Sequence, residues 1–255
     1  DSQLRSFVAD GLLHLPALVE TAIVDDCMCV LNRHLGTPGA VMAGGAQPGL
    51  GKLQGSLTQH MAVRAVVTPT VLRVLETVVG DCDVSNLTAQ LALRFPQEEV
   101  LGERAALQAG NGWHTDGLRR GRAHPFSILL GVALSDSDGP WQGNLTVWPG
   151  THRLVHSCLQ GENGAIDSRR MQDILDGKQV LARNAAYDRT DVLKDDARTA
   201  HHDNEPVDLP ALGPPVQLCL KRGDIIILHP DLAHTGGPNY GPHIRTVLYF
   251  RIKSK

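Results

Sequence analysis

The sequence has few aromatic residues and almost no net charge, and these deficits limit what it can bind. Phe, Trp and Tyr make up 4% of the 255 residues, too few for a platform on which nucleic-acid bases stack. The formal net charge is −3, whereas a nucleic-acid-binding surface usually carries an excess of Lys and Arg. We therefore expect no nucleic-acid partner.

Cysteine is also sparse, and long apolar runs are missing. The five cysteines are scattered and include no Cys-x-x-Cys pair, which is typical of reduced thiols in an intracellular protein. No apolar run approaches the roughly 20 residues of a membrane-spanning helix. We therefore expect a cytoplasmic protein with no membrane partner. Its length fits one domain that spans residues 1–255.

The stretch with the most chemical content is WHTDG at residues 113–117, which places His114 and Asp116 two residues apart. At the end of a β-strand, alternate side chains leave by the same face, with Cα atoms roughly 6–7 Å apart. An imidazole nitrogen and a carboxylate oxygen could then bind one metal ion. Because His-x-Asp also occurs by chance, the pair becomes informative only with a third ligand.

A third candidate ligand lies near the C-terminus. Gly223 and Asp224 form a turn before an apolar strand, and the strand leads into a polar, Gly-rich loop that carries His234. Two His and one Asp make the facial triad of non-haem Fe(II) oxygenases, which leaves three metal positions open. Eleven residues later, Arg245 begins an apolar final strand, and a buried Arg needs an anionic partner such as a carboxylate.

Hydrophobic periodicity and breaker residues predict the remaining elements. Helices are expected at 2–11, 19–35 and 68–80, and strands or extended segments at 12–16, 52–59, 86–95, 125–134 and 144–148, with a Gly-rich loop at 36–51. In the strand 86–95, Gln90 and Arg94 share a polar face, which would line a site inside a barrel or else face solvent.

Residues 161–213 are polar and long for a connection within one domain, which is typical of lids or disordered segments. Arg119, Arg120 and Arg122 directly follow the proposed metal ligands. A lid over a site edged by cations suggests a small substrate with a negative group. A solvated arginine loop beside a disordered insertion is at least as good an explanation.

Together the motifs resemble the phytanoyl-CoA dioxygenase family of Fe(II)- and 2-oxoglutarate-dependent oxygenases. The matching pieces are His114-Thr115-Asp116, then GNLTVWPGTH at residues 143–152, then His234 and Arg245, in the family's order. The segment 7–16 also resembles the family's start. The resemblance implies a mainly β fold with flanking helices at about 2–80, a double-stranded β-helix of the cupin-like jelly-roll type.

The resemblance also implies cofactors and roles. His114, Asp116 and His234 would bind Fe(II) and form the catalytic centre, and Arg245 would pair with the far carboxylate of 2-oxoglutarate, the co-substrate used with O2. A polar residue on the preceding strand maps to Gln90, and a second polar position maps to Lys52 or Gln54. The expected reaction is hydroxylation or another oxidation of a small molecule, with release of succinate and CO2.

One departure from the family pattern concerns the strand after the metal ligands. Many members carry an aromatic residue there, close to the co-substrate, whereas this chain has Leu-Leu-Gly-Val at 129–132. This puts the details of the pocket and a phytanoyl-CoA substrate in question. Two other interpretations remain open: a non-catalytic sensor of 2-oxoglutarate or metal, and a cupin-type metalloenzyme without a keto acid, in which Arg245 would have no role.

Overall fold

Two antiparallel sheets form the body of the protein. The computed structural model describes residues 2–35, 50–52, 59–85, 87, 89–98, 114–116, 118–119, 122–123, 126–153 and 214–255. The large sheet has the order β1(Leu12–Leu15), β10(Ile225–Leu228), β7(Ile128–Ala133), β12(Arg245–Ser254), β4(Ala89–Arg94), β2(Leu50–Lys52), and β3(Cys82–Asp83) pairs with β12. The small sheet has the order β11(His234–Gly236), β8(Leu145–Val147), β9(Val216–Gln217), and β5(Leu118–Arg119) pairs with β6(Arg122–Ala123). This is the double-stranded β-helix that the resemblance implies.

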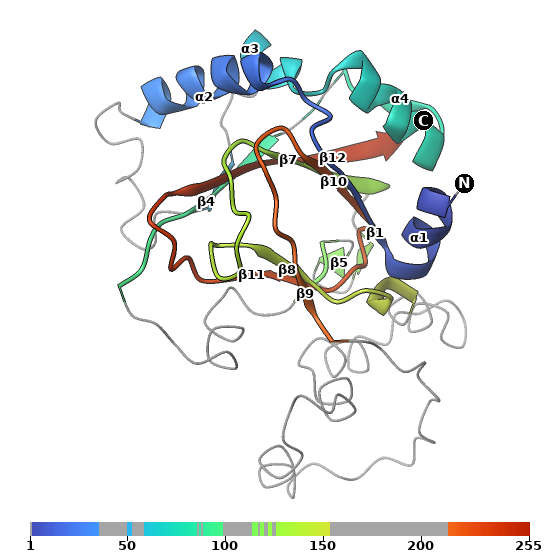
Figure 1. Ribbon diagram of the computed structural model, residues 1–255. Helices are drawn as coiled ribbons and strands as arrows, with labels where there is room; N and C mark the ends of the chain where they lie inside the picture. The colour runs from blue at the N-terminus through green and yellow to red at the C-terminus, as the bar shows by residue number, and fades with distance from the viewer. Residues whose placement is uncertain are drawn as a thin grey trace, which may run out of the picture.

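Helices cover the outer face of the large sheet, as Figure 1 shows for α2(Thr21–Leu35), α3(Met61–Ala65) and α4(Pro69–Val79), while α1(Ser2–Asp10) lies beside β1. α4 begins where the sequence predicts, because Oγ1 of Thr68 accepts the Val71 N–H at 3.2 Å and Pro69 occupies the first turn. It ends at Gly80, whose φ of +79° favours glycine.

The large sheet is buried on both faces, and alternate residues divide between two cores. On β12, Leu248 and Phe250 pack towards the helices, whereas Val247 and Tyr249 pack between the two sheets. All six residues of β7 are buried, which explains why its sequence is continuously apolar rather than alternating. On β4 the apolar residues face the helices, so its polar face points into the space between the sheets.

Most predicted elements are confirmed, with three differences. His234 lies on the short strand β11 rather than in a loop, because it pairs with Val147 of β8. The predicted edge strand at 52–59 appears instead as β2 at Leu50–Lys52, and residues 53–58 lie outside the described residues. The predicted loop at 36–51 is wrong at its end, because Leu50 and Gly51 belong to β2 and pair with β4. Its residues 36–49 and the lid-like segment 161–213 lie outside the described residues. The single-domain organisation stays a prediction.

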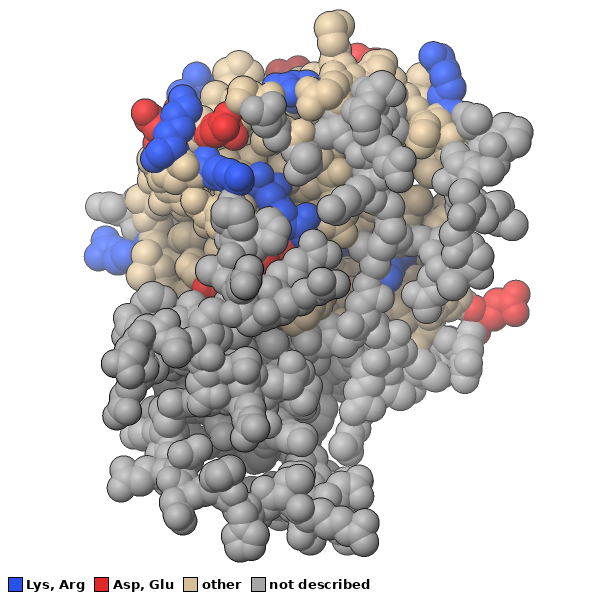
Figure 2. Space-filling view, turned by 180° about the vertical axis from the view of Figure 1, so that it is seen from behind, with Lys and Arg blue, Asp and Glu red and all other residues tan. Residues whose placement is uncertain are grey.

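The described surface carries side chains of both charges and a few large apolar ones. No helix within the described ranges is long and apolar enough to cross a membrane. On the face shown in Figure 2, Lys and Arg side chains lie near Asp and Glu side chains at the upper left, and single charged side chains of either sign lie elsewhere on the described surface. The exposed large hydrophobic residues of the described segments are Val8, Met61, Val216 and Ile244.

Candidate metal and co-substrate site

His114 and His234 face each other directly across a β-bridge. The His114 N–H donates to the His234 carbonyl at 3.1 Å, and the His234 N–H donates back at 3.0 Å. The two imidazole rings lie on the same side, with centroids 4.4 Å apart. The bridge therefore extends the small sheet by one residue and brings together two ligands that are 120 positions apart in the sequence.

Asp116 completes the cluster from two residues further along. One potential ligand atom from each of His114, Asp116 and His234 lies within 4.8 Å of the others. Two imidazole nitrogens and a carboxylate oxygen on one side of a cavity are the donor set of a non-haem Fe(II) site with open positions. The sequence-based prediction of these three residues as neighbours agrees with this geometry, and the donor set fits the metal that the resemblance implies.

The environment of His234 keeps its imidazole neutral and orients it. Nδ1 of His234 lies 2.9 Å from the Leu232 carbonyl, so this nitrogen carries the proton and Nε2 is left free to bind a metal. Burial and the neighbouring His114 lower the pKa of His234 to about 4. A neutral imidazole is the form that binds metal, so no deprotonation is needed near neutral pH.

Asp116 is held from the other side by Arg251 of β12. Nη2 of Arg251 lies 2.9 Å from Oδ2 of Asp116, and its Nη1 donates to Oε1 of Gln90 at 3.1 Å. The guanidinium also lies over the Phe126 ring, 5.7 Å from the centroid. Gln90 thus lines the cavity rather than facing solvent, but its side-chain oxygen is bonded to Arg251. The pair with Arg251 leaves Oδ1 of Asp116 available to a metal.

Arg245 is buried at the first position of β12, with 4% of its surface exposed. Its Nη2 donates to the Tyr249 hydroxyl at 3.0 Å, while its Nε has no hydrogen-bond partner in the described structure. A buried guanidinium with an unsatisfied donor is suited to a carboxylate, which can accept two parallel N–H bonds. The side chain faces the same cavity as His114, Asp116 and His234, which form the candidate metal-binding cluster.

Tyr249 of β12 lies beside Gly131 of β7, the strand that lacks the aromatic residue found in many family members. Gly131 pairs with Tyr249 on one side and with Ile226 on the other. A Cβ at position 131 would lie 2.6 Å from Cγ1 of Ile226 and 2.9 Å from Cε1 of Tyr249. Glycine on β7 therefore leaves room for the Tyr249 ring of β12 to reach the cavity beside Arg245.

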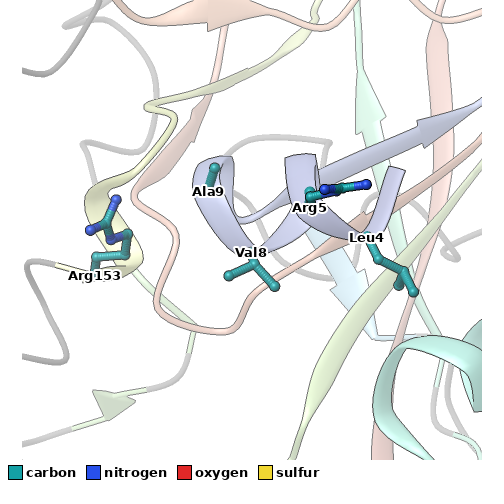
Figure 3. A pocket seen from close by; sticks show the side chains of 5 residues that line it. All are labelled: Leu4, Arg5, Val8, Ala9 and Arg153. Atoms are coloured by element: carbon teal, nitrogen blue, oxygen red, sulfur yellow. The ribbon is translucent and has the colours of Figure 1, made fainter. Parts of the chain in front are cut away.

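The cavity lies between the two sheets and has a volume of about 80 Å³. Its lining includes the three candidate metal ligands and two arginines, and comprises Gln90, Ala92, Arg94, His114, Asp116, Leu129, Leu145, His234, Gly236, Arg245 and Tyr249. A larger hollow of about 460 Å³ lies between α1 and Arg153 (Figure 3), but its lining of Leu4, Arg5, Val8, Ala9 and Arg153 contains no metal ligand.

Some predicted residues cannot be placed, and some site residues were not predicted. Lys52 belongs to β2, whose side chains are not described, and Gln54 lies outside the described residues. The same holds for Arg120, while Arg119 and Arg122 are described by their backbone pairing alone. Sequence reasoning missed Tyr249 and Arg251. They could have been found, because they follow Arg245 at even spacing on one strand and so share its face.

Comparison with known protein families gives a match over most of the chain. The sequence model of the phytanoyl-CoA dioxygenase (PhyH) family matches residues 51–247, a span that holds the metal-binding cluster and Arg245. The chain belongs to this family. The resemblance noted from the motifs is thereby confirmed, together with the non-haem Fe(II) and 2-oxoglutarate chemistry of the family. No curated protein matches the sequence.

Solved structures of such enzymes share the fold of this family member. The non-heme alpha ketoglutarate dependent epimerase SnoN from nogalamycin biosynthesis superposes with a TM-score of 0.62 at 15% identity, covering 99% of this chain and 81% of SnoN. The carbocyclase SnoK from the same biosynthesis gives 0.58 at 16%, covering 99% and 83%. EctD from S. alaskensis, solved with 2-oxoglutarate and 5-hydroxyectoine, gives 0.59 at 15%, covering 99% and 75%.

Proposed function

We propose that this chain is an Fe(II)- and 2-oxoglutarate-dependent oxygenase that oxidises a small organic substrate. The observation that carries the proposal is the arrangement of His114, Asp116 and His234 in one cavity with the buried cation Arg245. The three ligands would hold Fe(II). Arg245 and the Tyr249 hydroxyl would bind the far carboxylate of 2-oxoglutarate.

Once bound, the metal and co-substrate would supply the oxidising power in their reaction with O2, which would yield succinate and CO2. The protein contributes position and environment. Arg251 fixes the carboxylate of Asp116, and the Leu232 carbonyl fixes the ring of His234. Leu129 and Leu145 are buried and form apolar walls of the cavity.

We expect hydroxylation, because Asp116 keeps the third protein ligand that a halogenase would lack. Two structural neighbours are described as an epimerase and a carbocyclase, so this fold also carries other oxidative outcomes. A cupin-type enzyme without a keto acid is less consistent with the structure, since it would leave Arg245 buried without an acidic partner among the described residues.

Anaerobic titration with Fe(II) and 2-oxoglutarate tests the proposal. We expect a visible charge-transfer band when both are present, and O2-dependent formation of succinate once air is admitted. Binding of both ligands with no succinate, even across a wide panel of candidate substrates, would instead support a non-catalytic sensor. Failure to bind the keto acid in the presence of metal would refute the proposed function.

A further inference from the structure

Arg94 is a second cation in the candidate site, and the metal and co-substrate leave it without a role. Arg94 ends β4 and is the direct cross-strand partner of Arg245 on β12. Both side chains line the cavity. The acidic residues paired with a cation in the described structure are Asp25, Asp116 and Asp224, and none of them is bound to Arg94.

Two glycines of the small sheet make room for the Arg94 side chain. A Cβ on Gly236 would overlap the guanidinium of Arg94, and a Cβ on Gly143 would lie 2.7 Å from the Arg94 Cβ. Gly143 also has a φ of +74°, a conformation that favours glycine. Gly236 lies two residues after His234 on β11, so both face the same way and the Arg94 guanidinium lies beside the metal-binding cluster.

This position is electrostatically unfavourable without a ligand. Burial and the positive charge of Arg245 lower the pKa of Arg94, while Tyr249 acts in the opposite direction. A partly buried cation that meets a like charge is stabilised when an anion binds between or beside them. Asp116 cannot serve, because its Oδ2 is paired with Arg251.

2-Oxoglutarate has only two carboxylates, and the proposed function uses both. One carboxylate would bind at the metal and the other at Arg245. We propose, on the basis of that function, that Arg94 binds a carboxylate of the primary substrate and holds it beside the metal-binding cluster. The substrate class is thus a small organic acid. This assignment is independent of Arg119, Arg120 and Arg122, from which the sequence suggested an anionic substrate.

Trifluoroacetate is a suitable probe because fluorine NMR detects it directly. The protein is loaded without O2 with Mn(II) and 2-oxoglutarate, so that the paramagnetic ion broadens the signal of any acid bound near the metal. We expect saturable broadening for trifluoroacetate and none for neutral trifluoroacetamide. In Arg94→Gln, the affinity for trifluoroacetate should fall by about tenfold while that for 2-oxoglutarate is unchanged.

Two further variants complete the design. Arg94→Lys keeps a cation and should retain part of the affinity. Arg73→Gln removes an exposed arginine of α4 and should leave the affinities for trifluoroacetate and 2-oxoglutarate unchanged. Circular dichroism of each variant checks that it is folded.

Three results would overturn the inference. The wild type could fail to bind trifluoroacetate, or Arg94→Gln could bind it as tightly as the wild type. Arg94→Gln could also lose 2-oxoglutarate to the same extent as Arg245→Gln, which would make Arg94 part of the co-substrate site. Failure of the proposed function is a separate result. In that case Mn(II) and 2-oxoglutarate do not bind at all, and a fluorine shift titration of the metal-free protein still reports on Arg94.

Discussion

Arg251 and Asp116 form an ion pair of 2.9 Å, which joins β12, the C-terminal strand of the chain, to a proposed metal ligand. Both side chains are about four-fifths buried, at 23% and 20% exposed, so solvent screens the pair less than a surface pair. The contact takes one oxygen of the carboxylate and leaves the other for the metal. Arg251 is therefore a positioning residue, because it would act on the metal through Asp116.

Replacing Arg251 should loosen the metal site. We expect Arg251→Gln to weaken Fe(II) or Mn(II) binding by roughly 10- to 100-fold, the range for residues that orient a metal ligand. Anaerobic metal titration by calorimetry measures this. Arg222→Gln is the matched control, since it removes the ion pair with Asp25, which is exposed to solvent and lies outside the cavity. Equal metal affinity in the two variants would show that Arg251 does not position Asp116.

Tight metal binding by the cluster should require the imidazoles of both His114 and His234. His114→Ala or His234→Ala removes one of three protein ligands, so tight Fe(II) binding should be lost in both variants. The exposed His243 provides the control, and His243→Ala should bind Fe(II) like the wild type. Retention of wild-type affinity in both ligand variants would exclude the proposed triad.

Arg245 should matter for the keto acid rather than for the metal. In Arg245→Gln a buried, charge-assisted interaction is lost, and we expect 2-oxoglutarate to bind about 2–5 kcal/mol more weakly with the metal affinity unchanged. Tyr249→Phe removes one hydroxyl and should have a smaller effect in the same direction, about 0.5–1.5 kcal/mol. Calorimetry with Mn(II) present measures both. An unchanged affinity in Arg245→Gln would disprove its role.

Gly131 should resist even the smallest side chain. A methyl group there would contact Ile226 and Tyr249 at less than 3 Å, so Gly131→Ala should cost about 1–3 kcal/mol of unfolding free energy in urea. It should also weaken 2-oxoglutarate by displacing the Tyr249 ring. The double variant Gly131→Ala/Ile226→Ala relieves part of the overlap. Its cost should therefore be less than the sum of the two single costs, and strict additivity would argue against the contact.

Asp224 should make stability depend on pH in acid. Burial opposes its ionisation, but the N–H groups of Ala17 and Lys221 at 2.8 and 2.9 Å and the His14 ring hold the pKa of Asp224 below the ordinary value of 3.8. Its folded pKa is the lower one, so the stabilisation is present above pH 3.8 and is lost as the pH falls through the folded value.

Asp224→Asn should accordingly lower the free energy of unfolding by about 1–3 kcal/mol at neutral pH and flatten the acid slope. Urea unfolding between neutral and acid pH measures both. The exposed Asp25 supplies the comparison, and Asp25→Asn should leave the profile unchanged. An Asp224 variant with the wild-type slope would show that other carboxylates cause the acid sensitivity.

The sequence by itself predicted the candidate residues of the site and determined the periodicity of its strands. His114, Asp116, His234 and Arg245 were identified from residue type and order, and the polar face of β4 was identified from alternation at every second residue. Both signals are local, because side-chain direction along a strand depends only on position within that strand. The ends of α4 were equally readable, since Pro69 and Gly80 act within one turn of the helix ends.

Only the tertiary structure decided which side chains meet across the sheets. The register of β12 against β7 brings Tyr249 to Gly131, and the fold brings Arg251 to Asp116 over 135 positions and Arg94 to Gly236 over 142. His234 lies in a strand because it pairs with Val147 of β8. Such pairings depend on register between distant segments, and a slip of one residue would turn each side chain to the other face.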